Sequence, residues 1–341
     1  MHRTPRGQTG GAPPLWLMLT AVVLVAGNLR ATVSSFGAVL ADVQAATGLS
    51  AAVAGVITSI PLVCFAGFGA LSPMLARRLG LDRVIGGSIV LLTAALLLRV
   101  VGGVVVLLLG TLLACAGIAV VNVLLPVVVK IRFPRRIGMA TGAYSASLAT
   151  GSALGAGVSA PLAEVTSWEV ALAVWAVPAG VAAVLWAVVV RRWPSVPRRT
   201  ATNGEQVDGA THHERPNMRV VLRHPVTWAL AIFFGTQATY AYVQMGWVAV
   251  VFHDAGFSTS TSGLLVAVSI LVGVPVYFLV PSLASRSRDQ RVWTSLLTLL
   301  SIGSVVGLAL APASGAWLWA VMMGVGGGTF PLVLTMFNLR A

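Results

Sequence analysis

Ten long apolar segments, separated by short polar stretches, constrain the fold of this chain more than any other feature. They cover residues 15–38, 51–74, 84–101, 104–129, 138–162, 168–190, 226–252, 259–284, 292–311 and 315–338. Each is about long enough to cross a hydrocarbon core of ~30 Å as a helix that rises about 1.5 Å per residue. Soluble domains carry about 25% charged residues, whereas this chain has 9% and is 57% hydrophobic. The sequence therefore predicts an all-α integral membrane protein with about ten transmembrane helices.

The basic residues test this division into spans. If the N-terminus is cytoplasmic, 20 of the 22 Lys and Arg residues fall in cytoplasmic segments, and the exceptions are Arg30 and Arg99. The outward loops near 39–50, 163–168, 253–258 and 311–315 contain no Lys or Arg. The positive-inside rule thus predicts a multi-pass protein of the cell membrane with a cytoplasmic N-terminus. The net charge of +13 does not indicate nucleic-acid binding, because the basic clusters alternate with apolar spans and form no continuous face.

Other features exclude several functional classes. The two cysteines, Cys64 and Cys115, both lie in apolar segments and indicate neither a disulfide framework nor a metal site. No convergent catalytic set is present, and His253-Asp254 is interpreted as part of a solvated loop. We therefore expect no enzyme activity and no cofactor. The expected partners are a small-molecule substrate and the lipid bilayer, and the expected oligomeric state is a monomer.

The chain divides into two related parts. Residues 1–14 are interpreted as a disordered tail, 15–190 as a six-helix bundle, 191–225 as a cytoplasmic linker rich in Pro, Arg, Asn and Gly, and 226–341 as a second bundle holding spans seven to ten. Several residues recur at a constant offset, pairing Gly48 with Gly256, Ser50 with Ser258, Gly55 with Gly263, Pro73 with Pro281, Arg78 with Arg286 and Arg83 with Arg291. This agreement predicts duplicated halves.

Arg30 is the candidate centre of a substrate site. It is the single charge in the first span, and a guanidinium stays protonated in proteins. A charge at the bilayer centre costs about 2.5–3.5 kcal/mol on insertion scales, so it normally faces a bundle interior or a wet cavity. We interpret Arg30 as a contact for an anion or polar substrate; a structural role or snorkelling towards the outer surface are the alternatives. Ser34, one turn after Arg30 on the same face, and Asn28, two residues before it, are further candidate substrate contacts; capping of a carbonyl is the alternative for Ser34.

Further polar residues of the spans are candidate cavity residues. Asn122 is the one amide of span four, where an interhelical hydrogen bond is an equal alternative to a substrate contact. Gln237, Tyr240 and Gln244 share one face of span seven, which suits a wet wall or helix packing. Tyr144 on span five is a weaker candidate. The Gly-x-x-x-Gly patterns at 151–155 and 324–328 are interpreted as close helix packing.

Ionisable groups near the span ends have simpler interpretations. The spans hold no Asp, Glu or His well inside the membrane, so no proton relay of the usual kind is predicted there. Arg99 and the carboxylates Asp42 and Asp254 are expected at the outer surface.

Several stretches resemble the major facilitator superfamily, and more specifically its cyanate and 2-nitroimidazole (CynX/NimT-type) transporter branch. The stretches are Gly27–Arg30, Gly48–Ser50, Ser72–Gly80, Asn122–Pro126, Phe133–Arg136, Thr141–Ser145 and Gly326–Leu332. The resemblance implies the major facilitator fold, with a six-helix N-terminal bundle and an incomplete, four-helix C-terminal bundle. The family has twelve spans, so the resemblance also implies that spans eleven and twelve are missing.

The resemblance implies a secondary transporter that moves a small anion or polar solute, cyanate-like or nitroimidazole-like, by alternating access. Efflux of drug-like compounds is one alternative, and a non-transporting truncated fragment is another. Inner-loop residues Arg77, Arg78 and Arg286 are candidate gating residues. Arg77 occupies the position of the family's usual Asp, so the standard inner charge relay is not expected.

Overall fold

The computed structural model describes residues 15–193, 225–286 and 291–329, and every described element is helical. The N-terminal helices are α1 (Leu15–Ala38), α2 (Leu40–Thr47), α3 (Ala51–Cys64), η1 (Phe65–Gly69), α4 (Ala70–Leu79), α5 (Leu81–Leu98), α6 (Val104–Arg132), α7 (Ile137–Val165), α8 (Trp168–Ala173) and α9 (Ala176–Arg192). The C-terminal helices are α11 (Pro225–Gly246), α12 (Val248–Asp254), α13 (Thr259–Arg286), α14 (Arg291–Leu310) and α15 (Ala316–Gly326).

The helices reproduce the predicted spans. Among the described residues, seven helical segments are long and apolar enough to cross a membrane, including the continuous α3–η1–α4 segment and α8–α9. The remaining predicted spans correspond to α7, α11–α12 and α15. α7 is 29 residues long but rich in Gly, Ala and Ser, which lowers its hydropathy. Gly102 and Gly103, which lie between the predicted segments 84–101 and 104–129, separate α5 from α6.

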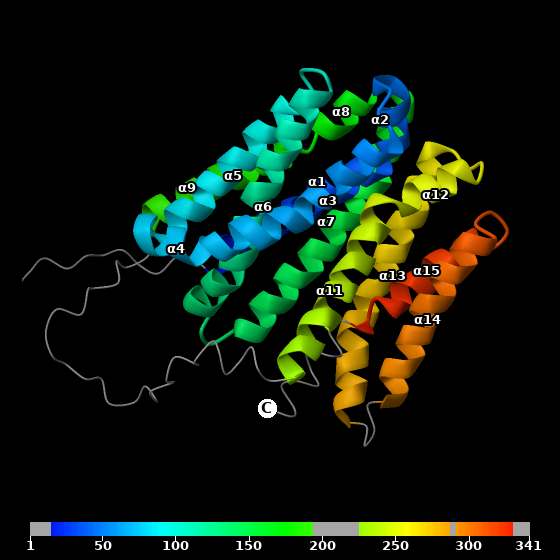
Figure 1. The fold of residues 1–341 in the computed structure, drawn as a ribbon. Helices are drawn as coiled ribbons and strands as arrows, with labels where there is room; N and C mark the ends of the chain where they lie inside the picture. The colour runs from blue at the N-terminus through cyan, green and yellow to red at the C-terminus, as the bar shows by residue number, and fades with distance from the viewer. Residues whose placement is uncertain (1–14, 194–224, 287–290, 330–341) are drawn as a thin grey trace, which may run out of the picture.

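The helices form two groups that lie side by side (Figure 1). α1 and α7 pack together, and α7 also packs along α13, which joins the N-terminal helices to the C-terminal ones. Glycines allow these close approaches. A Cβ at Gly155 would lie 2.6 Å from the Ala31 carbonyl oxygen, and one at Gly263 would lie 2.7 Å from the Ala156 carbonyl oxygen. The Gly151–Gly155 pattern therefore serves close packing, as predicted.

The internal repeat is visible in the backbone. Gly48 and Gly256 follow α2 and α12 with positive φ values of 68° and 97°, a conformation that favours glycine. The Ser50 hydroxyl then accepts a hydrogen bond from the Val53 N–H, and the Ser258 hydroxyl accepts one from the Thr261 N–H. Both copies thus end one helix with a left-handed glycine and begin the next with a serine cap.

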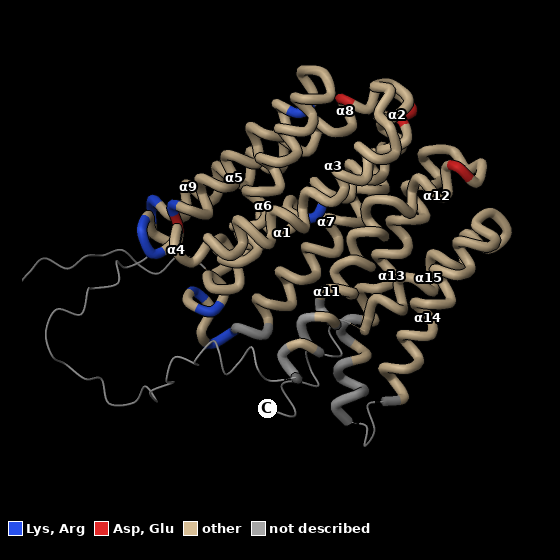
Figure 2. Tube along the Cα trace, viewed as in Figure 1, with Lys and Arg blue, Asp and Glu red and all other residues tan. Residues whose placement is uncertain are grey.

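Charge distinguishes the two ends of the molecule (Figure 2). Most of the described Lys and Arg residues gather at the end near α4, which we call the basic end. There Arg132 Nη2 donates to Asp82 Oδ2 at 3.0 Å and Nη1 donates to the Trp193 carbonyl at 3.2 Å. The opposite end holds α2, α8 and α12, and carries acidic residues, so we call it the acidic end.

Candidate functional site

Arg30 lies half-buried near the middle of α1, where it contacts residues of the C-terminal helix α11. Its guanidinium carbon is 5.5 Å from the centre of the Tyr242 ring, and Nη1 is 4.0 Å from Met245 Sδ. Tyr144 of α7 lies within electrostatic reach of Arg30. No carboxylate of the described residues lies within 4 Å of the guanidinium. An aromatic face and a thioether stabilise a cation weakly without neutralising it, so Arg30 keeps a positive charge that no described residue compensates.

The two predicted neighbours of Arg30 on α1 are more deeply buried. Asn28 Nδ2 donates to the Leu24 carbonyl at 2.8 Å, a bond within the same helix. Ser34 is fully buried, and its hydroxyl has no hydrogen-bond partner among the described residues. Their roles as substrate contacts stay predictions.

The predicted polar stripe of α11 contacts other C-terminal helices. Gln244 Nε2 donates to Ser269 Oγ of α13 at 2.8 Å, and the Tyr240 hydroxyl donates to the Met323 carbonyl of α15 at 3.2 Å. These bonds match the packing alternative for that stripe. Gln237 is half-buried and makes no hydrogen bond to described residues.

Asn122 of α6 is likewise half-buried, and the described residues offer it no hydrogen bond. Arg77 and Arg78 are exposed in the last turn of α4 at the basic end. Arg286 ends α13, and its side chain lies outside the described residues. The gating role of these arginines therefore stays a prediction.

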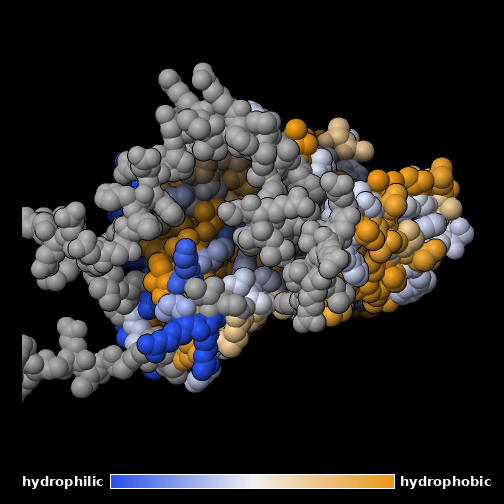
Figure 3. Space-filling model, turned by 90° about the horizontal axis from the view of Figure 1, so that it is seen from below, coloured by the Kyte–Doolittle hydropathy of each residue, from blue (hydrophilic) through white to orange (hydrophobic). Residues whose placement is uncertain are grey.

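The basic end is hollowed between the helices, and much of the visible wall of the hollow is hydrophobic (Figure 3). A smaller cavity lies further along α1, where Thr32, Val33, Phe36 and Gly37 follow Arg30 by up to two turns. The other helices contribute Ile57, Thr58, Pro61, Arg99, Thr111, Ala114, Cys115, Tyr242 and Gly246. Tyr242 therefore borders both Arg30 and this cavity. Within the cavity, the centre of a water molecule can occupy a volume of about 20 Å³.

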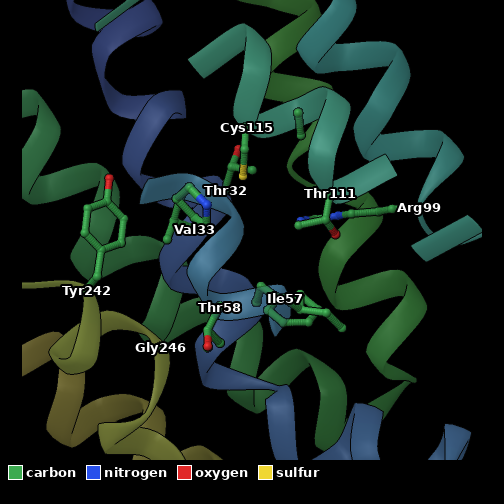
Figure 4. Close-up of a pocket in the computed structure, with 13 residues that line it drawn as sticks. Thr32, Val33, Ile57, Thr58, Arg99, Thr111, Cys115, Tyr242 and Gly246 are labelled. Atoms are coloured by element: carbon green, nitrogen blue, oxygen red, sulfur yellow. The ribbon is translucent and has the colours of Figure 1, made fainter. Parts of the chain in front are cut away.

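Arg99 is not at the outer surface, as the sequence had led us to expect. Only 1% of the residue is exposed, and its side chain reaches into the cavity from the side opposite Tyr242 (Figure 4). A Cβ at Gly110 would lie 2.5 Å from Arg99 Cβ, so that glycine lets the end of α5 pack directly on α6. This packing turns a residue at a span end into a buried one.

Tight contacts between the N-terminal and C-terminal helices close the cavity on the side of the acidic end. A Cβ at Gly37 of α1 would lie 1.9 Å from the Met245 carbonyl oxygen and 2.8 Å from Gly246 Cα. Trp247 Nε1 donates to Thr58 Oγ1 at 3.0 Å. We call these contacts the closed gate.

A polar layer lies beyond the closed gate. Thr259 Oγ1 donates to Asp42 Oδ1 at 3.3 Å, and the Ser260 N–H at the start of α13 donates to Glu164 Oε1 at 2.6 Å. Burial raises the pKa of Asp42, an effect that Glu164 reinforces, and the Thr259 hydrogen bond and His253 oppose it. Asp42 is half-buried here and not at an open surface.

The sequence missed Tyr242, Arg99 and Trp247 as site residues. Tyr242 lies on a different face of its helix from the Gln237 and Gln244 stripe, so the polar pattern directed attention away from it. Arg99 carried a usable signal, because it is one of only two basic residues that break the positive-inside pattern.

Comparison with known proteins identifies relatives over almost the whole chain. The profile of the Major Facilitator Superfamily matches residues 18–341. The uncharacterized transporter YycB of Bacillus subtilis is 31% identical over 331 residues, which cover 96% of this chain and 78% of the relative. The 2-nitroimidazole transporter of Escherichia coli is 29% identical and the cyanate transport protein CynX of the same species 30%, over 95% and 94% of this chain and 80% of each relative.

Solved structures agree with this fold. An inward-facing bacterial homologue of the human lysosomal transporter Spinster superposes with a TM-score of 0.75 at 16% identity, over 96% of this chain and 75% of that one. The D-xylose–proton symporter gives 0.71 at 14% identity, over 95% and 82%.

Proposed function

This chain belongs to the major facilitator superfamily and is a multi-pass secondary transporter, not an enzyme, and we propose that it carries a small anion or small polar solute. The proposed substrate class is cyanate-like or nitroimidazole-like. Relatives at about 30% identity are named for transport of cyanate and of 2-nitroimidazole, which supports this class.

The observation that carries the proposal is the uncompensated charge of Arg30. Its guanidinium touches an aromatic ring and a thioether, and no described carboxylate neutralises it. In a site of low dielectric such a charge attracts an anion, or the negative end of a polar molecule, far more strongly than it would in water. Tyr242 adds a face on which a flat solute can stack.

The proposed orientation places the basic end in the cytoplasm, and the protein in the cell membrane. The positive-inside rule supports it, since Arg77, Arg78, Lys130, Arg135 and Arg136 all lie at that end. In this orientation the hollow opens inwards and the closed gate faces outwards.

Transport then follows from alternating opening of the two ends. We assign residues 15–190 and 226–341 to the two bundles and 191–225 to the linker between them, and the bundles rock about the substrate site. Arg30 and Tyr242 come from different bundles, so a solute bound between them contacts both moving parts.

Uptake into proteoliposomes tests this proposal. The purified chain is reconstituted, and uptake of radiolabelled cyanate and of 2-nitroimidazole is measured for the parent, for Arg30→Gln and for Arg83→Gln. Arg83 is exposed on α5, so its substitution removes the same charge away from the site. A hydrogen bond to a charged group contributes about 1.5–3 kcal/mol, which corresponds to a ~10–100-fold loss of apparent affinity for Arg30→Gln.

Two outcomes would contradict the proposal. If saturable uptake by Arg30→Gln equals that of the parent, Arg30 does not bind the substrate. Absence of uptake, together with resistance to bulky amphipathic compounds in an expressing strain, would instead assign drug efflux.

A further inference from the structure

Arg99 carries a second uncompensated charge, deeper in the molecule than Arg30. Its side chain is almost completely buried, and its one hydrogen bond to the described residues runs from Nη2 to the Leu172 carbonyl at 3.3 Å. The buried Nε has no partner, and no described carboxylate lies within 4 Å. Burying a guanidinium without a counter-charge is costly, so a purely structural bond to one carbonyl is poor compensation.

The hydroxyl groups of the cavity separate into satisfied and unsatisfied ones. Thr32 Oγ1 donates to the Asn28 carbonyl at 2.9 Å, and Thr58 Oγ1 accepts the indole N–H of Trp247. Thr111 Oγ1, in contrast, is buried and has no hydrogen-bond partner. Arg99 and Thr111 both line the cavity, and Figure 4 shows them on the side away from Tyr242. Among the described lining residues, Arg99 Nε and Thr111 Oγ1 are the two buried nitrogen or oxygen atoms without a partner, and they lie on the same side of one small space.

These two donors, one of them charged, form a polar site that attracts an anion. Charge-assisted hydrogen bonds from a guanidinium to an anion are short and about twice as strong as neutral ones. The remaining lining is mostly apolar, with Val33, Phe36, Ile57 and Pro61 among it. Apolar walls favour weakly hydrated monovalent anions over strongly hydrated divalent ones, because the cost of removing water from an ion rises steeply with its charge.

The size of the cavity limits the ligand further. It offers about 20 Å³ to the centre of a water-sized molecule, and a single water needs at least ~10–15 Å³ by this measure. The cavity therefore holds one or two water-sized groups, so it suits a linear anion of about three heavy atoms better than an anion that carries an aromatic ring.

We propose that Arg99 and Thr111 form a second binding site, specific for small monovalent anions of cyanate size, between Arg30 and the closed gate. This inference rests on the proposed function, since it assigns one substrate class to that pathway. Arg30 and the hollow accept both cyanate-sized anions and larger solutes, whereas the Arg99 site admits the small anion alone. Tyr242 borders both sites, so an anion passes from one to the other along α1.

Isothermal titration calorimetry with two anions of different size tests this site. The full chain in nanodiscs is titrated with sodium thiocyanate, a linear triatomic anion, and with sodium benzenesulfonate, which carries a ring. Ionic strength is held constant with gluconate. We expect Arg99→Gln to weaken thiocyanate binding at this site by about 10-fold or more and to leave benzenesulfonate binding unchanged. Arg30→Gln should weaken benzenesulfonate binding.

Two further variants complete the experiment. Thr111→Val keeps the shape of the side chain and removes its hydroxyl, and should weaken thiocyanate binding about 2–10-fold. If Arg99→Gln does not fold, thiocyanate binding to Thr111→Val decides the test. Arg83→Gln is the matched control and should bind both anions as the parent does.

The outcomes separate this site from the proposed function. Unchanged thiocyanate binding in Arg99→Gln and Thr111→Val overturns the Arg99 site, while loss of binding in Arg30→Gln still supports the proposed function. Parent protein that binds neither anion overturns both. Equal loss of the two anions in Arg99→Gln also overturns the proposal, because the site would then not select the small anion.

Discussion

Replacing Gly37 by alanine should open the closed gate. The added Cβ would lie 1.9 Å from the Met245 carbonyl oxygen, whereas ordinary Cβ contacts begin at 3.4 Å. The obstructing atoms belong to the backbone of Met245 and Gly246, so no side-chain rotation relieves the overlap. α1 and α11 must therefore separate by about 1.5 Å at this level.

The size of the effect follows from the cost of overpacking, which is about 1–3 kcal/mol in well-packed regions. The cost applies to the closed form, because α1 and α11 part when the gate opens. The ratio of closed to open molecules should then fall by about 5–150-fold. A structure that is mostly closed would become a mixture, or mostly open.

Double electron–electron resonance between two spin labels measures this shift. The labels replace Ala45 of α2 and Asp254 of α12, which are exposed at the acidic end on opposite sides of the gate. Cys64 and Cys115 are first replaced by alanine, so that the labels attach at the intended positions only. Gly37→Ala should transfer population from the short distance to a longer one.

Gly87→Ala is the matched control. Gly87 is also in a helix, and an added Cβ there meets nothing within 4 Å. Alanine at this position brings the same gain in helix propensity, up to about 1 kcal/mol, without the clash. Gly87→Ala should therefore keep the short distance between the labels. If Gly37→Ala gives the parent's distance distribution, the contact between α1 and α11 does not hold the gate closed, and the reasoning fails.

The other predictions concern charged groups at the two ends. Burial raises the pKa of Asp42 in the closed form above its ordinary 3.8, so Asp42 takes up a proton when the gate closes. Protonation therefore favours closure fully below the ordinary pKa, and this contribution is lost as the pH rises through the raised pKa of the closed form. The label distance should follow this titration in the parent and lose it in Asp42→Asn; the same titration in both would assign it to another group. At the basic end, Arg132→Gln removes the ion pair with Asp82 and should lower the unfolding free energy by about 1–3 kcal/mol. Thermal unfolding in detergent measures this, with exposed Arg135→Gln as the control; equal midpoints would show that the pair contributes little.

The spans could be predicted from sequence because lipid selects for one property, apolarity over a fixed length. Segments 15–38 and 104–129 coincide almost completely with α1 and α6. The rotation of each helix about its axis could not be predicted in the same way. In α11 the stripe containing Tyr240 and Gln244 is polar, yet it bonds to α13 and α15, and Tyr242 meets Arg30. Polarity alone does not distinguish a wet wall from a hydrogen bond between helices.

Arg99 shows that the burial of a residue could not be predicted from the sequence either. Its position beside Gly102 and Gly103 predicts the end of a span, and the chain does turn there. Burial comes instead from contacts distant in sequence, namely Gly110 on α6 and the Leu172 carbonyl at the end of α8. Such contacts leave no local pattern. The positive-inside rule still identified Arg99 as an exception, and a charge buried at membrane depth is by default a hypothesis for a functional site.

The closed gate and the Arg99 site share residues, which couples them. Gly37 and Thr58 line the cavity, and the same two residues make the contacts to α11 and to Trp247 that hold the gate closed. An anion bound there contacts the closed form of the gate, and opening disrupts part of its lining. Linkage makes this relation reciprocal: the factor by which the bound anion raises the closed-to-open ratio equals the factor by which closure raises the affinity for the anion. On this proposal the site binds its anion most tightly while the gate is closed, and binds it more weakly once α1 and α11 separate.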